Sequence, residues 1–213
     1  EGADFDAVLR EAQEKGYAER DPEADIEGHD ACRKIAILSS LMTGRNVDAE
    51  KICTEGITKV TQADFAYLKA AGKTVKLLGI GKLQEDDSVL AMVAPFVIDG
   101  DHPLAMVNDV FNAVFVTGNM LGDSMYYGRG AGKLPTASAV VSDVVDCARH
   151  IGKVIMCFWD RQDAVLADVS ETECAYFVRV VSTARSAVEA AFPGCSVFTL
   201  PGRNEDFAVF TAP

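Results

Sequence analysis

Positive charge is scarce in this sequence. Its 213 residues include 20 lysines and arginines against 32 aspartates and glutamates, a formal net charge of -12 at pH 7. Nucleic acids and anionic membrane surfaces bind proteins through a positive footprint, and no block rich in lysine or arginine supplies one here. The charge balance therefore predicts a protein that binds neither nucleic acid nor membrane.

The sequence also lacks the usual pattern of a structural zinc site. Its six cysteines form no Cys-x-x-Cys pair, and only three histidines could join them as ligands. Cys157 lies in an apolar run and Cys32 on a predicted helix, which favours buried, reduced thiols and a cytosolic protein. No apolar run approaches the length of a membrane span, and the N-terminal residues do not resemble a signal peptide. We therefore expect a cytoplasmic protein without a metal site.

The sequence also lacks a dinucleotide-binding turn. No Gly-x-Gly-x-x-Gly sequence precedes Gly16, and no strand-helix-strand unit carries an acidic residue at the distance that such a fold needs. The chain begins with Glu1 instead of methionine, which we interpret as a sign of a cut fragment. We therefore expect these residues to contain no Rossmann domain.

What is present is the composition of a soluble globular protein, with 49% hydrophobic and 24% charged residues. Hydrophobic periodicity predicts three early helices, over about 3–15, from 28 or 29 to Gly44, and over about 61–71. In the third helix, Phe65 and Leu68 are expected to face inward. Apolar runs then predict four strands, mostly antiparallel neighbours in one sheet, over 74–83, 88–96, 109–118 and 123–128. A short turn or helix is expected at 102–105.

The rest of the chain predicts one long helix and a small strand-rich unit. The helix follows a glycine-rich turn, and its predicted buried stripe consists of Ala137, Val140, Val141, Val144 and Ala148. Beyond Lys153 the order strand, helix, strand, strand is expected over 175–181, 183–192, 196–200 and 207–211. The predicted fold class is α+β, a mostly antiparallel sheet with helices packed on one face plus a small βαββ C-terminal unit. We expect domains at 1–152 and 153–213.

The densest ionisable chemistry lies in residues 16–34. Five carboxylates surround a turn there, and Asp30 and Lys34 follow one helical turn apart. Because this pair shares a helical stripe with Ile37 and Leu41, we expect it to point inward. An inward lysine beside a carboxylate, with Glu19 from the preceding turn, is a candidate proton-transfer group. The alternative is a solvated ion pair that stabilises the helix by a few tenths of a kcal/mol.

A second chemical stretch is the glycine-rich turn that begins at Gly128. Glycines before a helix let backbone N–H groups approach an anion, although they more often solve a steric problem. The turn matches neither the dinucleotide fingerprint nor a P-loop, in which Ser or Thr would replace Leu134 after Lys133.

Both stretches resemble one family. Gly-Tyr-Ala-Glu at 16–19, Asp21-Pro22, Asp25 and Gly-x-Asp-Ala-x-Arg-Lys at 28–34 are similar to the substrate-binding motif of homoserine dehydrogenases. Asn-Ala at 112–113, Tyr-Gly-x-Gly-Ala-Gly at 127–132 and Pro-Thr-Ala at 135–137 resemble the segment by which that family returns to its nucleotide domain. The resemblance implies reduction of L-aspartate 4-semialdehyde to L-homoserine with NADP or NAD as cofactor, a step in threonine, methionine and isoleucine biosynthesis.

The resemblance also implies roles in the substrate site. Lys34 would be the catalytic proton donor, Asp30 the neighbouring substrate-site acid, and Glu19 the carboxylate that holds the substrate amino group. Tyr17 and Gly16 would belong to the substrate-binding motif. The chain departs from the usual pattern at Arg20 and Cys32, neither of which is expected to touch the reacting groups.

The remaining implications concern the cofactor and partners. Gly128 and Gly130 would contact a nicotinamide cofactor held mainly by a Rossmann domain missing from this chain, so the fragment alone is expected to be inactive. Residues 153–213 are similar to the first four elements of an ACT domain, and the apolar sheet predicts a homodimer. The alternative is a non-catalytic amino-acid-sensing or dimerisation module, which would have no use for an inward Lys34.

Overall fold

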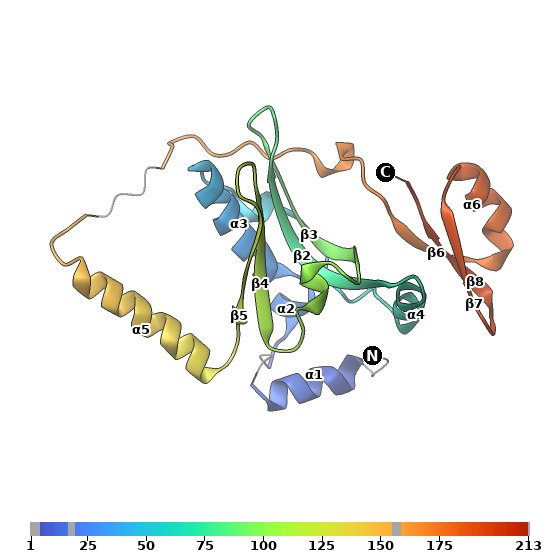
Figure 1. Ribbon diagram of the computed structural model, residues 1–213, viewed down its shortest axis with the longest axis horizontal. Coiled ribbons are helices and arrows are strands. Elements are labelled where there is room, and N and C mark those ends of the chain that lie inside the picture. The colour runs from blue at the N-terminus through green and yellow to red at the C-terminus, as the bar shows by residue number, and fades with distance from the viewer. Residues whose placement is uncertain (1–4, 17–19, 155–158, 213) are drawn as a thin grey trace. The chain divides into compact units, whose positions relative to one another are not determined.

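The computed structural model describes residues 5–16, 20–154 and 159–212 (Figure 1). The chain divides into two compact units. The larger unit comprises residues 23–100 and 160–213, and the smaller unit comprises residues 3–22 and 101–159. The fold class is α+β with mostly antiparallel pairing, as predicted. No helix among the described residues has the length and hydropathy needed to span a membrane.

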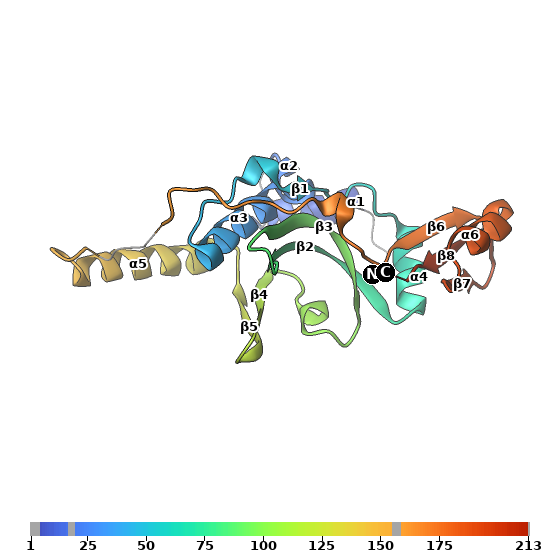
Figure 2. The ribbon, with the colours of Figure 1, turned by 90° about the horizontal axis from the view of Figure 1, so that it is seen from above.

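The larger unit is built on a long β-hairpin covered by one helix. Strands β2 (Lys73–Leu83) and β3 (Val89–Asp99) pair antiparallel along their whole length, and the two-residue strand β1 (Cys53–Thr54) adds in parallel to β3. Helix α3 (His29–Thr43) lies across one face of this hairpin (Figure 2). These positions confirm the predicted helix and both predicted strands.

Glycines set the ends of α3 and its distance from the sheet. Gly28 and Gly44 flank the helix in the left-handed region, at φ 80° and 65°, a conformation that costs glycine little. Gly79 and Gly81 of β2 face the helix, where an added Cβ would meet side-chain atoms of Ile35 and Ser39. The absence of two side chains therefore lets α3 lie close to β2. The core beneath consists of Cys32, Ala36, Val47, Ile52, Val89, Ala91 and Val93.

Helix α4 (Gln62–Ala70) begins at a capping box and ends directly before β2. The Thr61 side chain accepts from the Asp64 backbone N–H, and the Asp64 carboxylate accepts from the Thr61 N–H, so two helix N-terminal donors are satisfied. Leu68 is buried as predicted, but Phe65 is 39% exposed, so its predicted inward orientation is wrong. Tyr67 takes the buried place because α4 packs between β2 and the C-terminal strands.

The end of the larger unit has the predicted order of strand, helix, strand and strand. Strands β6 (Phe177–Val181), β7 (Ser196–Leu200) and β8 (Arg203–Phe210) form an antiparallel sheet in the order β6-β8-β7. We call it the C-terminal sheet. Helix α6 (Arg185–Ala191) connects β6 to β7 after a 3-10 turn (Ser182–Ala184). The likeness of this unit to an ACT domain stays a prediction.

The smaller unit holds a hairpin and two helices. Within the described part of the chain, strands β4 (Phe111–Gly118) and β5 (Gly122–Arg129) pair only with each other, so the prediction of one sheet containing four successive strands is wrong. The eleven residues between β3 and β4, which include a 3-10 turn (Pro103–Met106), are too long for a tight hairpin that would force the two pairs together. Helix α1 (Phe5–Glu14) and the 3-10 turn agree with the predicted elements.

Helix α5 (Lys133–Arg149) forms where it was predicted, but its apolar stripe is not buried. Val140, Val141 and Val144 are 57%, 60% and 62% exposed. A helical apolar stripe shows which side chains share a face, and does not show that a partner is present to cover it. The short elements that remain are α2 (Glu23–Ile26), η1 (Ala49–Lys51) and η3 (Val169–Glu171).

Candidate functional site

The predicted proton-transfer pair is formed on α3. Lys34 Nζ lies 2.6 Å from Asp30 Oδ2, and both residues come from the first two turns of the helix. Asp30 stands in the first turn, where the positive end of the helix dipole favours a carboxylate. The local sequence therefore places a cation and an anion side by side at the start of this helix.

The predicted inward orientation of this pair is wrong. The Lys34 and Asp30 side chains are 61% and 47% exposed, and Ile37 and Leu41, on the same stripe, are 61% and 60% exposed. The face that meets the hairpin instead carries Cys32, Ala36 and Ser39. Ile35 and Ser39 of the same face lie directly against Gly79 and Gly81 of β2. The prediction was wrong because Ile37 and Leu41 are aliphatic, which suggested that their stripe of α3 faces the core.

Two of the predicted substrate residues, Tyr17 and Glu19, lie outside the described residues. Cys157, predicted to be a buried thiol, does so as well. Gly16 follows α1 at φ 72°, a left-handed conformation that suits glycine at the end of a helix. The thiol of Cys32 is buried as expected and donates to the Ala49 carbonyl oxygen at 3.3 Å.

The predicted cofactor-contacting glycines lie at the end of the β4–β5 hairpin. Gly128 is opposite Asn112 in the sheet, and the Gly130 N–H donates to the Val110 carbonyl at 3.2 Å. A Cβ on Gly130 would collide with the Asn112 side-chain amide. Gly130 is therefore required locally for a close approach of that amide to the backbone.

A shallow hollow of about 270 Å³ adjoins these two glycines. An aromatic stack lies at its edge. The Phe111 and Tyr127 rings are 4.8 Å apart and nearly parallel, and the Arg129 guanidinium lies 5.4 Å from the centre of the Phe111 ring. The sequence contains each of these residues, but only the strand register brings Phe111 opposite Arg129 and so assembles the stack.

A larger ionic cluster was not predicted. It joins α4 to the C-terminal sheet and centres on the Asp206 carboxylate, whose side chain is only 6% exposed. Arg203 binds that carboxylate through Nε at 2.6 Å and a second nitrogen at 3.0 Å, and Arg179 adds a third contact at 3.0 Å. The Tyr67 hydroxyl donates to it at 2.8 Å. Arg179 also reaches Asp64 at 2.7 Å.

These contacts decide the electrostatics of the cluster. The Arg203 hydrogen bonds, helped by Tyr67 and Arg179, hold the pKa of Asp206 well below its usual range although burial opposes this. Burial also acts against ionisation of Asp64, but hydrogen bonds from Thr61 and Arg179 outweigh it and lower the pKa of that carboxyl. Burial, and then the Asp206 carboxylate, raise the pKa of Tyr67. Both carboxylates are therefore kept charged, and Tyr67 protonated.

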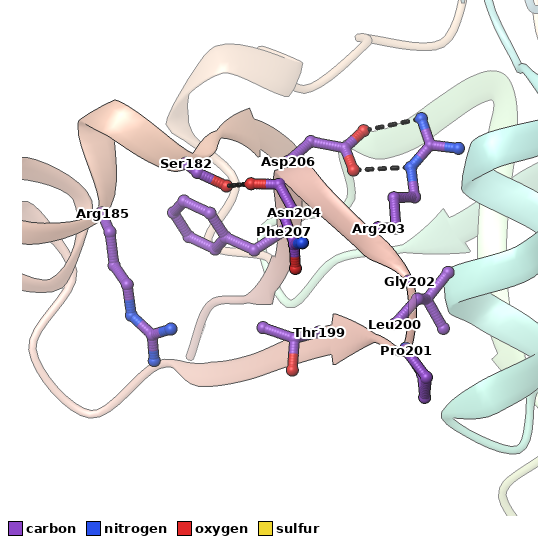
Figure 3. A pocket seen from close by; sticks show the side chains of 10 residues that line it. All are labelled: Ser182, Arg185, Thr199, Leu200, Pro201, Gly202, Arg203, Asn204, Asp206 and Phe207. Atoms are coloured by element: carbon purple, nitrogen blue, oxygen red, sulfur yellow. Dashed lines mark hydrogen bonds and ion pairs between the residues drawn. The ribbon is translucent and has the colours of Figure 1, made fainter.

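A cavity of about 470 Å³ lies beside β8, on the C-terminal sheet (Figure 3). Figure 3 shows Asp206 and Arg203 together on one side of β8, with Phe207 and Arg185 on the other. Arg185 is already paired with Glu189 at 2.9 Å and lies 5.9 Å from the Phe207 ring centre. Ser182 donates to the Asn204 carbonyl across the rim at 2.5 Å. Within the described ranges, no group of three or more His, Cys, Asp or Glu residues could hold a metal ion.

Comparison with known proteins gives the family of this chain. The family model described as homoserine dehydrogenase matches residues 1–145. The homoserine dehydrogenase of Synechocystis sp. is 55% identical over 149 residues, which cover 68% of this chain and 34% of the relative. That of Helicobacter pylori is 41% identical over 179 residues, which cover 84% of this chain and 42% of the relative.

The solved structures agree with this result. A homoserine dehydrogenase from Thiobacillus denitrificans superposes with a TM-score of 0.84 at 35% identity. The superposition covers 100% of this chain and 52% of the Thiobacillus chain. A hyperthermophilic archaeal homoserine dehydrogenase in complex with NADPH gives a TM-score of 0.54 at 30% identity and covers 70% of this chain and 41% of its own. The match defines the chain as part of a dehydrogenase family. The chain belongs to the homoserine dehydrogenase family, and spans about a third to a half of these relatives.

Proposed function

We propose that this chain is the substrate-binding and C-terminal portion of an enzyme that reduces L-aspartate 4-semialdehyde to L-homoserine. Residues 1–152 would form the substrate-binding and catalytic part and residues 153–213 the C-terminal segment. The observation that carries the proposal is the ion pair of Asp30 and Lys34 on α3, formed within the region that matches the family.

In the proposed reaction, Lys34 donates a proton to the aldehyde oxygen as the carbonyl is reduced. Asp30, 2.6 Å away, orients the Lys34 ammonium. Glu19 binds the substrate ammonium, and Tyr17 and Gly16 complete the substrate motif. When bound, the nicotinamide cofactor, NADP or NAD, supplies the hydride. The exposure of the ion pair supports a site that becomes desolvated only when substrate and the rest of the enzyme cover it.

The glycine turn of the smaller unit would contact the cofactor through Gly128 and Gly130. Among the described residues, a Cβ at Gly128 would meet nothing within 4 Å, so the backbone there is open to the approach of a flat ring. The archaeal relative in complex with NADPH supports a nicotinamide cofactor. Most of the cofactor contacts would come from a Rossmann domain in the same polypeptide, so this chain alone should not turn over the substrate.

The decisive experiment replaces Lys34 in the whole enzyme. Lys34→Ala should lower kcat by about two to four orders of magnitude, the usual result of losing a positioned acid. Glu19→Gln should mainly raise KM, because the contact to the substrate ammonium persists from ground state to transition state. The matched control is Lys59→Ala. Lys59 forms the same i, i+4 pair with Glu55 at 2.9 Å and is 81% exposed, but lies outside the proposed site.

Unchanged turnover in Lys34→Ala, with a normal melting curve, would refute the catalytic role. The other candidate is a non-catalytic amino-acid-sensing or dimerisation module. It predicts that Lys34→Ala leaves turnover unchanged, and this separates it from the enzyme because both readings allow self-association. We also propose that the enzyme is a homodimer. Sedimentation of the chain at micromolar concentration tests this directly, and a strict monomer would contradict it.

A further inference from the structure

The ionic cluster around Asp206 crosses the boundary between two parts of the larger unit. Tyr67 and Asp64 come from α4, whereas Arg179, Arg203 and Asp206 come from the C-terminal sheet. Arg179 spans the boundary, since it contacts Asp64 on one side at 2.7 Å and Asp206 on the other at 3.0 Å. Its third contact is the N-cap hydroxyl of α4, Thr61, at 3.2 Å.

Because this cluster is buried, its polar groups need hydrogen-bond partners within the protein. Tyr67 is fully buried and Asp206 is 5% exposed, so their polar groups depend on each other for hydrogen bonds in place of water. A buried charge that loses its partner is strongly unfavourable, whereas an exposed one simply becomes hydrated. Separation of the C-terminal sheet from α4 would break the contacts of Arg179 with Asp64 and Thr61, and the hydrogen bonds of the Tyr67 hydroxyl to Asp206.

Helix α4 is connected through β2 to the helix that carries Lys34. Helix α4 ends at Ala70, and β2 begins at Lys73. Gly79 and Gly81 of β2 then lie directly against α3. A second link comes from Lys73, whose ammonium lies 5.8 Å from the ring centre of Phe210 on β8. The first residue of β2 is thus also held by the C-terminal sheet.

We propose that Arg179 and Asp206 form a lock by which the C-terminal sheet fixes α4 and, through it, the β2 strand on which α3 rests. The C-terminal sheet is then part of the scaffold of the larger unit, and its docked state sets the stability of α4 and β2. Arg179 is a positioning residue in this scheme and touches no reacting group. The lock does not depend on the proposed reaction, because its contacts lie within the isolated chain.

Hydrogen exchange of the full chain, followed by mass spectrometry, tests the lock. Arg179→Gln should speed amide exchange by about tenfold or more in 62–70 and 73–83, beyond the local effect on 177–181. Arg179→Lys should give a smaller increase, because one ammonium cannot satisfy both carboxylates with the planar fork of arginine. The matched control is Arg185→Gln, which removes an exposed ion pair with Glu189 on α6, the helix that connects two strands of the C-terminal sheet.

A double variant distinguishes coupling between Arg179 and Asp64 from a local effect of the Arg179 substitution. If Arg179 acts through Asp64, the combined variant Asp64→Asn with Arg179→Gln should exchange little faster in 73–83 than Arg179→Gln alone. Exchange in 62–83 that stays at the rate of the unmodified chain, or changes no more than in Arg185→Gln, would overturn the proposal. Independent, multiplicative effects of the two substitutions would also overturn it. All these variants keep the apolar core, so folding can be checked by an unchanged far-UV circular dichroism spectrum.

Discussion

The closest approach between α3 and β2 offers a sharp test of how this fold is packed. Gly81→Ala would place a Cβ nearer than 3.0 Å to the Ser39 hydroxyl oxygen, and 3.3 Å from Ile35 Cδ1. Ser39 is 2% exposed, and its hydroxyl has no hydrogen-bond partner among the described residues. The clash therefore involves one oxygen atom that contributes no hydrogen bond there.

The magnitude follows from three terms. Overpacking of a tight core costs about 1–3 kcal/mol. Replacement of glycine by alanine returns about 0.4–1 kcal/mol by restricting the unfolded chain. Gly81→Ala should therefore lower the free energy of unfolding by about 1–2 kcal/mol. Ser39→Ala removes an unsatisfied buried hydroxyl and should be neutral or stabilising by about 1 kcal/mol. With both changes the clash is absent, so the double variant should be at least as stable as the original chain.

Urea unfolding of the four proteins measures this cycle, and equal slopes would show that the compactness of the states is unchanged. The expected coupling energy is about 2 kcal/mol. Gly79→Ala is the matched control, because its Cβ would meet Ile35 Cβ at 3.0 Å and the Ala31 carbonyl oxygen at 3.4 Å, contacts that Ser39→Ala does not relieve. Additive effects at Gly81 and Ser39, or an equal rescue of Gly79→Ala, would refute the packing argument.

Three further predictions concern stability. The pKa of Asp206 in the folded chain lies below its ordinary value of 3.8, so the stability that the charged carboxylate contributes is present above about pH 4 and is lost as the pH falls below it. The difference in urea midpoint between the original chain and Asp206→Asn should therefore shrink in acid. A difference that stays constant with pH would contradict this. Thr61→Ala should destabilise the chain by about 1 kcal/mol in thermal unfolding, while Thr61→Ser, which keeps the cap of α4, should not. Gly28→Ala should cost at least about 1–2 kcal/mol by urea unfolding, because the residue has φ 80° and its Cβ would lie 3.1 Å from Val93 Cγ1; a stability equal to that of the original chain would show that this turn can relax.

Local chemistry explains why the elements of the larger unit were predictable. The Gly44 N–H donates to the Ser40 carbonyl at 2.9 Å after the end of α3, and Thr61 caps the start of α4. A few neighbouring residues therefore determine the end of α3 and the start of α4. The polar residues 84–87 separate two apolar runs that pair along their full length. Each signal depends on sequence neighbours alone.

Predictions that required a partner surface were less successful. Periodicity identified the stripes of α3 and α5 but could not say which stripe meets a neighbour, since that depends on residues far along the chain. The glycines of β2 carry the missing information for α3. Because Gly79 and Gly81 have no side chain, Ile35 and Ser39 of α3 can lie directly against β2, and this sets which face of the helix meets the sheet. The same limit hid the Asp206 cluster, in which Asp64 and Arg179 are 115 residues apart.

Two ionic groups of the larger unit, the Asp30–Lys34 pair and the Asp206 cluster, differ in their exposure to solvent. The pair of Asp30 and Lys34 is about half exposed, and such pairs contribute at most a few tenths of a kcal/mol to folding. The fold therefore has little need of this pair, and its exposure is compatible with the proposed role in proton transfer. The Asp206 carboxylate is buried and held by two arginines and a tyrosine. A group so enclosed is unsuited to proton transfer but well suited to holding two parts of the chain in one arrangement.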